Sequence, residues 1–428
     1  MNPKPGSRRG WKILGGFLAI LSAATGGLWL WIRSVETRQW AEMEARLRGL
    51  EQEAAARPGE RPILRGDPLP GSAWEDYDRA LKSMKEIGSV APLADYLSRH
   101  PRADRNRILD LLKSQAPTLE AMRRGVRRAD GARKIDWRLE AGRGNMSLQS
   151  LVSLAIAQAR EGAAEGRGHE AAELLLDAVR VGEDLGTNSD LISALIADGL
   201  MLLSLDELKG IVLTGPLNES QLRQIAGELD ALDRHAPRFG DILVNGATCA
   251  GWDMRHADSI GGYLKFYAAL YPQGMPGVSA WRFAFSERMM MKDAFEKELD
   301  WSRRIARADA RSWDDARRII REVDAERAAS TNGISRVVGR WLSGDGYYSL
   351  GASFRERRAQ MRLLRAAALF RAGGDIPESD DPFDGKLIHH LKERRLKIWS
   401  VGRDAVDDGG SGEWNPRSGK DIVLEVER

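Results

Sequence analysis

The chain has 428 residues, of which 43% are hydrophobic and 30% are charged, a composition that excludes general disorder and is sufficient for more than one apolar core. Its 65 basic and 62 acidic residues nearly cancel, so we expect no nucleic acid partner, which would require a strongly basic surface. Cys249 is the only cysteine, which excludes an internal disulfide and a cysteine-based zinc site.

An uncharged, mostly apolar run at residues 13–32 is the first feature in chain order. As a helix it would cross the roughly 30 Å hydrocarbon core of a bilayer. Basic side chains crowd residues 1–12, so the positive-inside rule makes this tail cytoplasmic. The pattern predicts a transmembrane signal anchor with the lipid bilayer as a partner. It also predicts a single-pass protein of the bacterial inner (cytoplasmic) membrane with an extracytoplasmic C-terminal domain. A cleaved signal peptide is the alternative.

Residues 33–57 alternate in charge around a narrow apolar stripe, which predicts a helical stalk. The stripe consists of Trp40, Met43, Leu47 and Leu50. It spans only about two heptads, so packing on its own domain is favoured over pairing with a second chain. Residues 58–71 contain four prolines and three glycines, which forbid regular helix and predict an extended linker.

Apolar residues at helical spacing recur through residues 72–372 and predict a mainly α domain. Ser72 and Glu75 form a capping-box pattern at its start, and Gly162–Gly168 joins two strongly amphipathic segments into a helical hairpin. Residues 191–208 are apolar around almost the whole helix, so we expect other helices to enclose them. The hairpin resembles a tetratricopeptide pair, and both a helical repeat array and an irregular helical domain fit the pattern.

The stretch from residue 240 to residue 281 mixes glycines, prolines and aromatic residues with little periodicity. We expect a packed loop or short helices there. Core filling is the favoured role for aromatic side chains such as Trp252, Tyr263 and Tyr267, and a ligand groove is the alternative.

Residues 373–428 lack the helical spacing of the preceding domain and show turn and strand patterns instead. A turn at residues 381–386 is followed by strand-like patterns at 387–390, 395–400 and 421–426. They predict a small C-terminal antiparallel β-sheet.

The C-terminal part of the chain has a characteristic order of features. A helix is followed by a DP turn with a glycine, the run Ser-Val-Gly-Arg-Asp at residues 400–404, a glycine-rich acidic loop and Asp421-Ile422. From about Phe354 to the end, the chain resembles the C-terminal tail of the major pseudopilin of type II secretion. It also resembles uncharacterised membrane-anchored helical proteins of the planctomycete and myxobacterial type, which share the run at residues 61–77.

The pseudopilin resemblance implies a structural calcium site in the acidic loop. It assigns side-chain ligands to Asp404 and Asp421 and carbonyl ligands to Val401 and Val406. The acidic residues Asp407 and Asp408 of the same loop are spare candidates. Calcium takes six to eight oxygen ligands, which such a loop can supply. Lys420 and an insertion around Trp414 depart from the pseudopilin pattern, and a solvated acidic turn is the alternative.

No nucleophile, metal-protease or nucleotide-binding motif occurs in a supporting context, so we assign no catalytic residue. We expect an interaction or scaffolding protein with a protein partner in the cell envelope. An envelope hydrolase with its site at residues 240–281 is one alternative. An accessory component of a pilus-like secretion system is the other.

Overall fold

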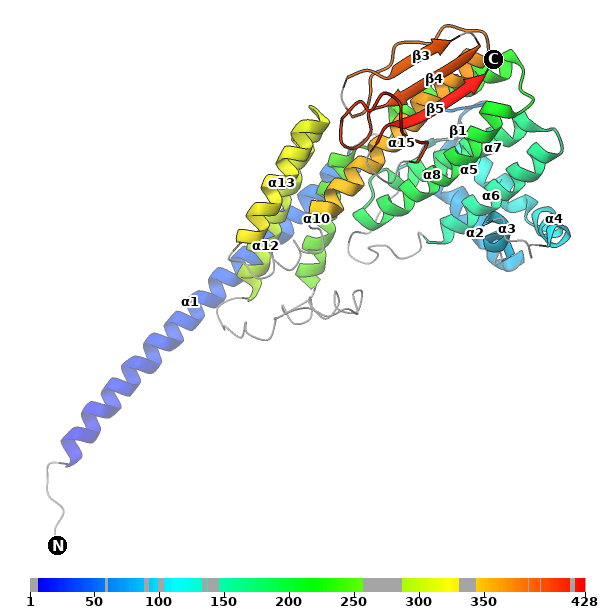
Figure 1. The fold of residues 1–428 in the computed structure, drawn as a ribbon. Coiled ribbons are helices and arrows are strands. Elements are labelled where there is room, and N and C mark those ends of the chain that lie inside the picture. The colour runs from blue at the N-terminus through cyan, green and yellow to red at the C-terminus, as the bar shows by residue number, and fades with distance from the viewer. Residues whose placement is uncertain are drawn as a thin grey trace.

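The computed structural model describes residues 7–57, 61–87, 92–98, 104–132, 137, 146–256, 287–330, 344–383, 385–392, 394–415 and 420–427. This part of the chain is mainly helical and ends in a small antiparallel sheet, so both coarse expectations for the fold are confirmed (Figure 1). The helices are α1 (Ser7–Ala55), α2 (Ala73–Ile87), α3 (Pro92–Leu97), α4 (Arg105–Ser114), α5 (Ala116–Val126), α6 (Met146–Ala164), α7 (Gly168–Gly186), α8 (Leu191–Thr214), α9 (Glu219–His235), α10 (Phe239–His256), α12 (Glu287–Asp309), α13 (Trp313–Ala329) and α15 (Gly344–Arg371). The strands are β1 (Leu69–Ser72), β2 (Arg128–Asp130), β3 (Ile388–Lys392), β4 (Arg395–Ser400) and β5 (Ile422–Glu427).

Helix α1 runs without a break from Ser7 to Ala55, and its side chains are described from Thr25 onward. Within the described residues, no helix combines the length and the apolar character needed to span a membrane. The finding contradicts the predicted transmembrane anchor at residues 13–32 and the single-pass inner-membrane location.

The second half of α1 packs on the protein's own helices. Its stripe of Trp40, Met43, Leu47 and Leu50 is buried in a core shared with α10 and α12. The helices approach so closely that a Cβ atom on Gly251 would lie 2.7 Å from Leu47 Cδ2. This packing confirms the expectation that the stripe contacts its own domain.

The main core is built from α2 to α10, α12, α13, α15 and the C-terminal sheet. Local signals in the sequence set the ends of several of these helices. Asp190 caps α8 by accepting hydrogen bonds from the backbone N–H groups of Ile192 and Ser193. Asn218 and Gln221 form a reciprocal capping box at the start of α9. The hairpin of α6 and α7 also forms where the sequence predicts it.

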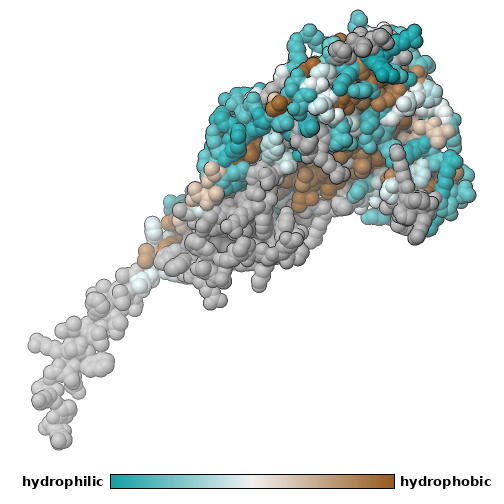
Figure 2. Space-filling view, in the orientation of Figure 1, coloured by the Kyte–Doolittle hydropathy of each residue, from teal (hydrophilic) through white to brown (hydrophobic). Residues whose placement is uncertain are grey.

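Helix α8 is less enclosed than its sequence suggests. Its buried residues face α6, α7 and α15, but the side chains of Ile192, Leu195 and Leu203 are 46%, 56% and 45% exposed. The expectation that other helices enclose residues 191–208 is therefore wrong, because the described helices that pack on α8 leave these three side chains uncovered. On the face of the body shown in Figure 2, apolar residues lie at the surface among hydrophilic ones.

The C-terminal sheet has the order β3-β4-β5, with both pairs antiparallel. It lies over α15, and the buried residues of β4 and β5, including Leu396 and Ile422, join the main core (Figure 1). Helix α10 occupies the first part of the aromatic stretch, where Trp252 is a buried core residue. The rest of that stretch, residues 257–281, lies outside the described residues, so the hydrolase site expected there has no structural account.

Candidate functional site

The expected linker lies on the body of the protein as an ordered strap, which we define as residues 61–67. Arg61 starts the strap, and its backbone N–H donates to the carbonyl oxygen of Ala129 at 3.3 Å. Its buried guanidinium group donates to the carbonyl oxygens of Gly125, Val126 and Arg128 at 2.9, 3.3 and 3.1 Å. The contacts with Gly125 and Val126 reach carbonyl groups in the last turn of α5, which have no partner four residues further along the helix. The contact with Arg128 ties the strap to β2.

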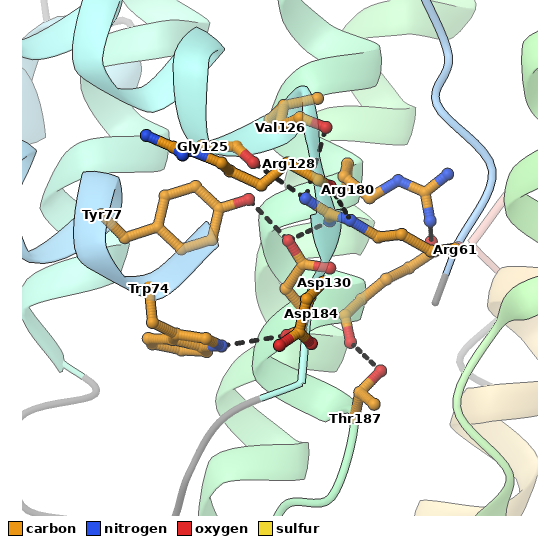
Figure 3. Close-up of polar contacts among 12 residues, drawn as sticks. Arg61, Trp74, Tyr77, Gly125, Val126, Arg128, Asp130, Arg180, Asp184 and Thr187 are labelled. Carbon is orange, nitrogen blue, oxygen red and sulfur yellow. Dashed lines mark hydrogen bonds and ion pairs between the residues drawn. The ribbon is translucent and has the colours of Figure 1, made fainter. Parts of the chain in front are cut away.

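The same guanidinium group forms an ion pair with Asp184 on α7. Figure 3 shows Arg61 and Tyr77 approaching the Asp184 carboxylate from opposite sides, and the Tyr77 hydroxyl donates to Asp184 Oδ2 at 2.6 Å. Beside them, the Trp74 indole N–H donates to the carbonyl oxygen of Gly131 at 3.0 Å. Burial raises the pKa of Asp184, although Arg61 favours its charged form.

Arg65 fastens the other end of the strap. It forms ion pairs with Asp177 on α7 and Glu228 on α9, and it donates to the carbonyl oxygen of Glu173 at 2.9 Å. Burial raises the pKa of Asp177 to about 6 and that of Glu228 to about 7. A single arginine therefore joins the strap to two helices.

A pocket of about 460 Å³ opens beside the first of these ion pairs. Its walls come from the end of α1, the C-terminal end of α7, the turn that leads into α8, and the connection between α9 and α10. The lining residues are Arg57, Arg61, Gly131, Arg180, Glu183, Asp184, Gly186, Thr187, Asn188, Arg234, His235, Ala236, Pro237, Arg238, Asp241 and Ile242. Five arginines face three carboxylates, so the lining has an excess of positive charge.

Arg180 and Glu183 form what we call the floor of the pocket. Both residues are 1% exposed, and Arg180 Nη1 donates to Glu183 Oε2 at 2.9 Å. Arg180 also donates to the carbonyl oxygen of Pro62 in the strap at 3.2 Å. Burial raises the pKa of Glu183 to about 8, although the charge of Arg180 acts in the opposite direction. The floor therefore contributes little negative charge at neutral pH.

Arg57, Arg234 and Arg238 form what we call the rim. Arg57 lies 3.6 Å from Asp241, and Arg234 forms an exposed ion pair with Asp230 one helical turn earlier. Arg238 is exposed, and its side chain has no partner in the described part of the chain. Because exposed ion pairs are weak, the guanidinium groups of Arg234 and Arg238 can contact a ligand at the pocket mouth. Arg57 is partly buried and also donates to Asn245 Oδ1 at 3.4 Å.

Sequence reasoning missed this site. The signal that could have found it lies in α7, where Asp177, Arg180 and Asp184 repeat at helical spacing within an apolar helix. Charges at positions that should be buried need partners of opposite charge. Arg61 and Arg65, four residues apart in the proline-rich segment, are those partners for Asp184 and Asp177.

The residues expected to bind calcium lie near one another in the loop between β4 and β5, but the structure uses several of them to close that loop. The Asp421 carboxylate is buried and accepts hydrogen bonds from the N–H groups of Asp408, at 3.3 Å, and Gly410, at 2.7 Å. Asp407 Oδ1 accepts from the Trp399 indole at 3.0 Å and from the N–H group of Gly409 at 2.9 Å.

Asp404 turns its carboxylate towards the N–H group of Val406, at 3.1 Å, and its carbonyl oxygen accepts from Arg317 at 2.9 Å. Val401 donates its N–H to Asp381, a buried residue that also binds Ser400. Among the residues that the structure describes, no three acidic, histidine or cysteine side chains form a group suited to a metal ion. Calcium binding stays a prediction, and Asp381 is the structural residue that the sequence reasoning did not single out.

The fold and the pocket together define a mainly helical protein with buried arginine–carboxylate clusters and a small C-terminal sheet. Comparisons with known proteins identified no related protein. No family model matches the chain, and no match was found among curated proteins or solved structures.

Proposed function

We propose that this protein is a binding protein whose helical domain holds a small anionic ligand in the arginine-lined pocket. The observation that carries the proposal is the arrangement of charge in the lining. Asp184 is already paired with Arg61, and Glu183 with Arg180. Asp241, the third carboxylate of the lining, lies 3.6 Å from Arg57, so Arg234 and Arg238 supply positive charge that the lining itself does not neutralise.

The electrostatics of the pocket favour an anion for a second reason. A phosphate or carboxylate group accepts hydrogen bonds from arginine in a planar, two-point geometry, and such charge-assisted bonds are among the strongest that proteins form. Partial enclosure by the pocket walls reduces screening by solvent relative to an open surface. A small anion at the rim would therefore be held by several donors at once.

Calorimetric titration of the full chain with inorganic pyrophosphate tests this proposal. We expect saturable binding that weakens as salt concentration rises. Arg234→Ala should weaken binding at least fivefold. Arg223→Ala is the matched control, because Arg223 lies on the same helix with similar exposure and pairs with Glu219 one turn earlier, but it is not part of the pocket. Equal affinity of both variants and the wild type would contradict the proposal.

The exposed apolar face of α8 supports a second candidate function, the docking of a protein partner. Ile192, Leu195 and Leu203 lie on one side of the helix, and a Cβ atom on Gly199 between them would meet nothing within 4 Å. Apolar residues grouped on one exposed helix face are typical of interaction surfaces.

A photo-crosslinking residue at position 195 tests this docking surface in the native host. We expect a discrete crosslinked product that disappears when Ile192 and Leu203 are both changed to Ser. The same crosslinker at Glu219, an exposed charged position on α9, is the control. Identical product patterns at the two positions would rule out a specific partner at α8.

A further inference from the structure

Two polar atoms on the pocket floor have no hydrogen-bond partner among the described residues. They are Arg180 Nε and Glu183 Oε1. Both side chains are almost completely buried, both line the pocket, and they are already joined to each other through Arg180 Nη1 and Glu183 Oε2. Buried polar groups are normally satisfied, and because this ion pair also lines the pocket, its two atoms offer a position for a group of the ligand.

The chemistry of the two atoms restricts what that group can be. Arg180 Nε carries a hydrogen atom and can only donate, whereas Glu183 Oε1 accepts when the carboxyl group is ionised. A second carboxylate or a phosphate oxygen would satisfy Arg180 but would repel an ionised Glu183, so it suits the floor in only one protonation state. A hydroxyl group accepts from Arg180 and can either donate to an ionised Glu183 or accept from a protonated one, so it satisfies both atoms in either state.

Asp184 and Arg61 add no competing donor at the floor, because they are bonded to each other and to Tyr77 and α5. The rim arginines lie on other elements, at the end of α1 and around the connection between α9 and α10. The pocket therefore combines two kinds of partner, a floor suited to a hydroxyl group and rim arginines suited to negative charge.

We infer that the pocket takes a small phosphate ester that also carries hydroxyl groups, with a hydroxyl group on the Arg180–Glu183 floor and the phosphate at the arginine rim. This inference rests on the proposed function, since it adds the identity of the ligand class to a site already proposed to bind anions. It makes Glu183 a residue that determines specificity.

The test compares glycerol 3-phosphate with propyl phosphate by calorimetric titration of the full chain. The two esters have the same phosphate group and the same number of carbon atoms, but only the first carries hydroxyl groups. We expect glycerol 3-phosphate to bind at least tenfold more tightly, because a site built to bond a hydroxyl group discriminates against an analogue that lacks one. Equal affinities would overturn this inference while leaving anion binding intact. Failure of both esters and of pyrophosphate to bind would overturn the proposed function itself.

Two variants separate the floor from the rim. Arg234→Ala should lower the affinity for both esters by the same factor and leave their ratio unchanged. Glu183→Gln should reduce the ratio at least threefold while changing the affinity for propyl phosphate little. An unchanged ratio in a folded Glu183→Gln protein would contradict the role of Glu183. Circular dichroism establishes whether that variant is folded, and if it is not, the wild-type ratio and Arg234→Ala decide the question.

Discussion

The Tyr77 hydroxyl donates a 2.6 Å hydrogen bond to Asp184 Oδ2, which ties α2 to α7 at a point where both side chains are buried. The same oxygen receives Arg61 from the strap, so one carboxylate joins three parts of the chain that are distant in sequence. A buried carboxylate is tolerated only when it is paired and hydrogen-bonded, and Asp184 meets both conditions.

Tyr77→Phe removes one of these partners without changing the shape of the side chain. We expect the free energy of unfolding to fall by about 1–3 kcal/mol, the usual cost of leaving one buried partner of a charge-assisted bond unsatisfied. Urea denaturation measures this change. Tyr96→Phe is the control, because the Tyr96 hydroxyl also donates to a carboxylate, Glu161, but at a partly exposed position. A smaller effect at Tyr77 than at Tyr96 would contradict the central role of Asp184.

Arg65→Met leaves Asp177 and Glu228 without their shared arginine. We expect a loss of about 3–5 kcal/mol in the free energy of unfolding, because Glu228 loses its arginine and Asp177 keeps only a longer contact, at 3.6 Å, with the half-exposed Arg123 among the described residues. Arg79→Met is the matched control: Arg79 is exposed and also pairs with a buried carboxylate, Asp76, but Asp76 keeps Arg124 and Arg128. Hydrogen exchange should show faster exchange in the strap of Arg65→Met alone. A strap that remains protected would show that Arg65 does not fasten it.

Stability should depend on pH through Glu183. Burial raises the pKa of this residue from its usual 4.5 to about 8, so between these values the folded state binds a proton that the unfolded state has lost. Stability is therefore fully present below pH 4.5 and falls as pH rises towards 8, by up to about 1.4 kcal/mol per pKa unit.

Glu183→Gln cannot lose a proton, so its stability should fall less steeply than that of the wild type. Asp177 and Glu228, with pKa values of about 6 and about 7, act in the same direction at lower pH. The contrast between variant and wild type is therefore clearest between pH 7 and pH 8. Thermal melts at several pH values measure it, and parallel curves over that interval would count against a protonated Glu183.

Gly251 separates α10 from α1 and α12. Gly251→Ala would place a methyl group 2.6 Å from Phe295 and 2.7 Å from Leu47, so we expect a loss of about 1–3 kcal/mol from overpacking. Gly227→Ala on α9 is the control, because its Cβ atom would meet nothing within 4 Å. That variant should gain up to about 1 kcal/mol from helix propensity. If both variants were equally stable, α1 would not pack on α10 as closely as the structure shows.

The calcium prediction has a direct test. The full chain should melt at a higher temperature with calcium than with a chelator, because a ligand that binds only the folded state stabilises it. Asp404→Ala should remove the difference. Asp381→Asn is a useful comparison, because Asp381 binds Ser400 and Val401 and its replacement should lower the melting temperature with or without calcium. Equal melting curves for the wild type in calcium and chelator would refute the site.

Local patterns in the sequence were sufficient to predict most of the helices and the C-terminal sheet. The capping box at Asn218, the cap at Asp190 and the positive φ angle at Gly373 after α15 are local features, and each marks a helix boundary in the structure. The alternation in residues 421–426 likewise predicts β5. Such elements depend on neighbours within a few residues, which the sequence shows directly.

The pocket and the strap could not be predicted in the same way. Prolines around Arg61 and Arg65 indicate an extended segment, and charged residues in such segments are usually solvated. Their partners lie on α7 and α9, more than 100 residues further along the chain, and no local pattern connects them. The exposure of Leu195 also depends on how many helices surround α8, which periodicity does not reveal.

The strap has a consequence for how the chain acquires its structure. Arg61 and Arg65 are synthesised early, but Asp177, Asp184 and Glu228 follow them by 112, 123 and 163 residues. During synthesis both arginine side chains therefore stay solvated until α7 and α9 have been synthesised and pack against the strap. Contacts of such long sequence separation form slowly, so closure of the strap belongs to the last steps of folding.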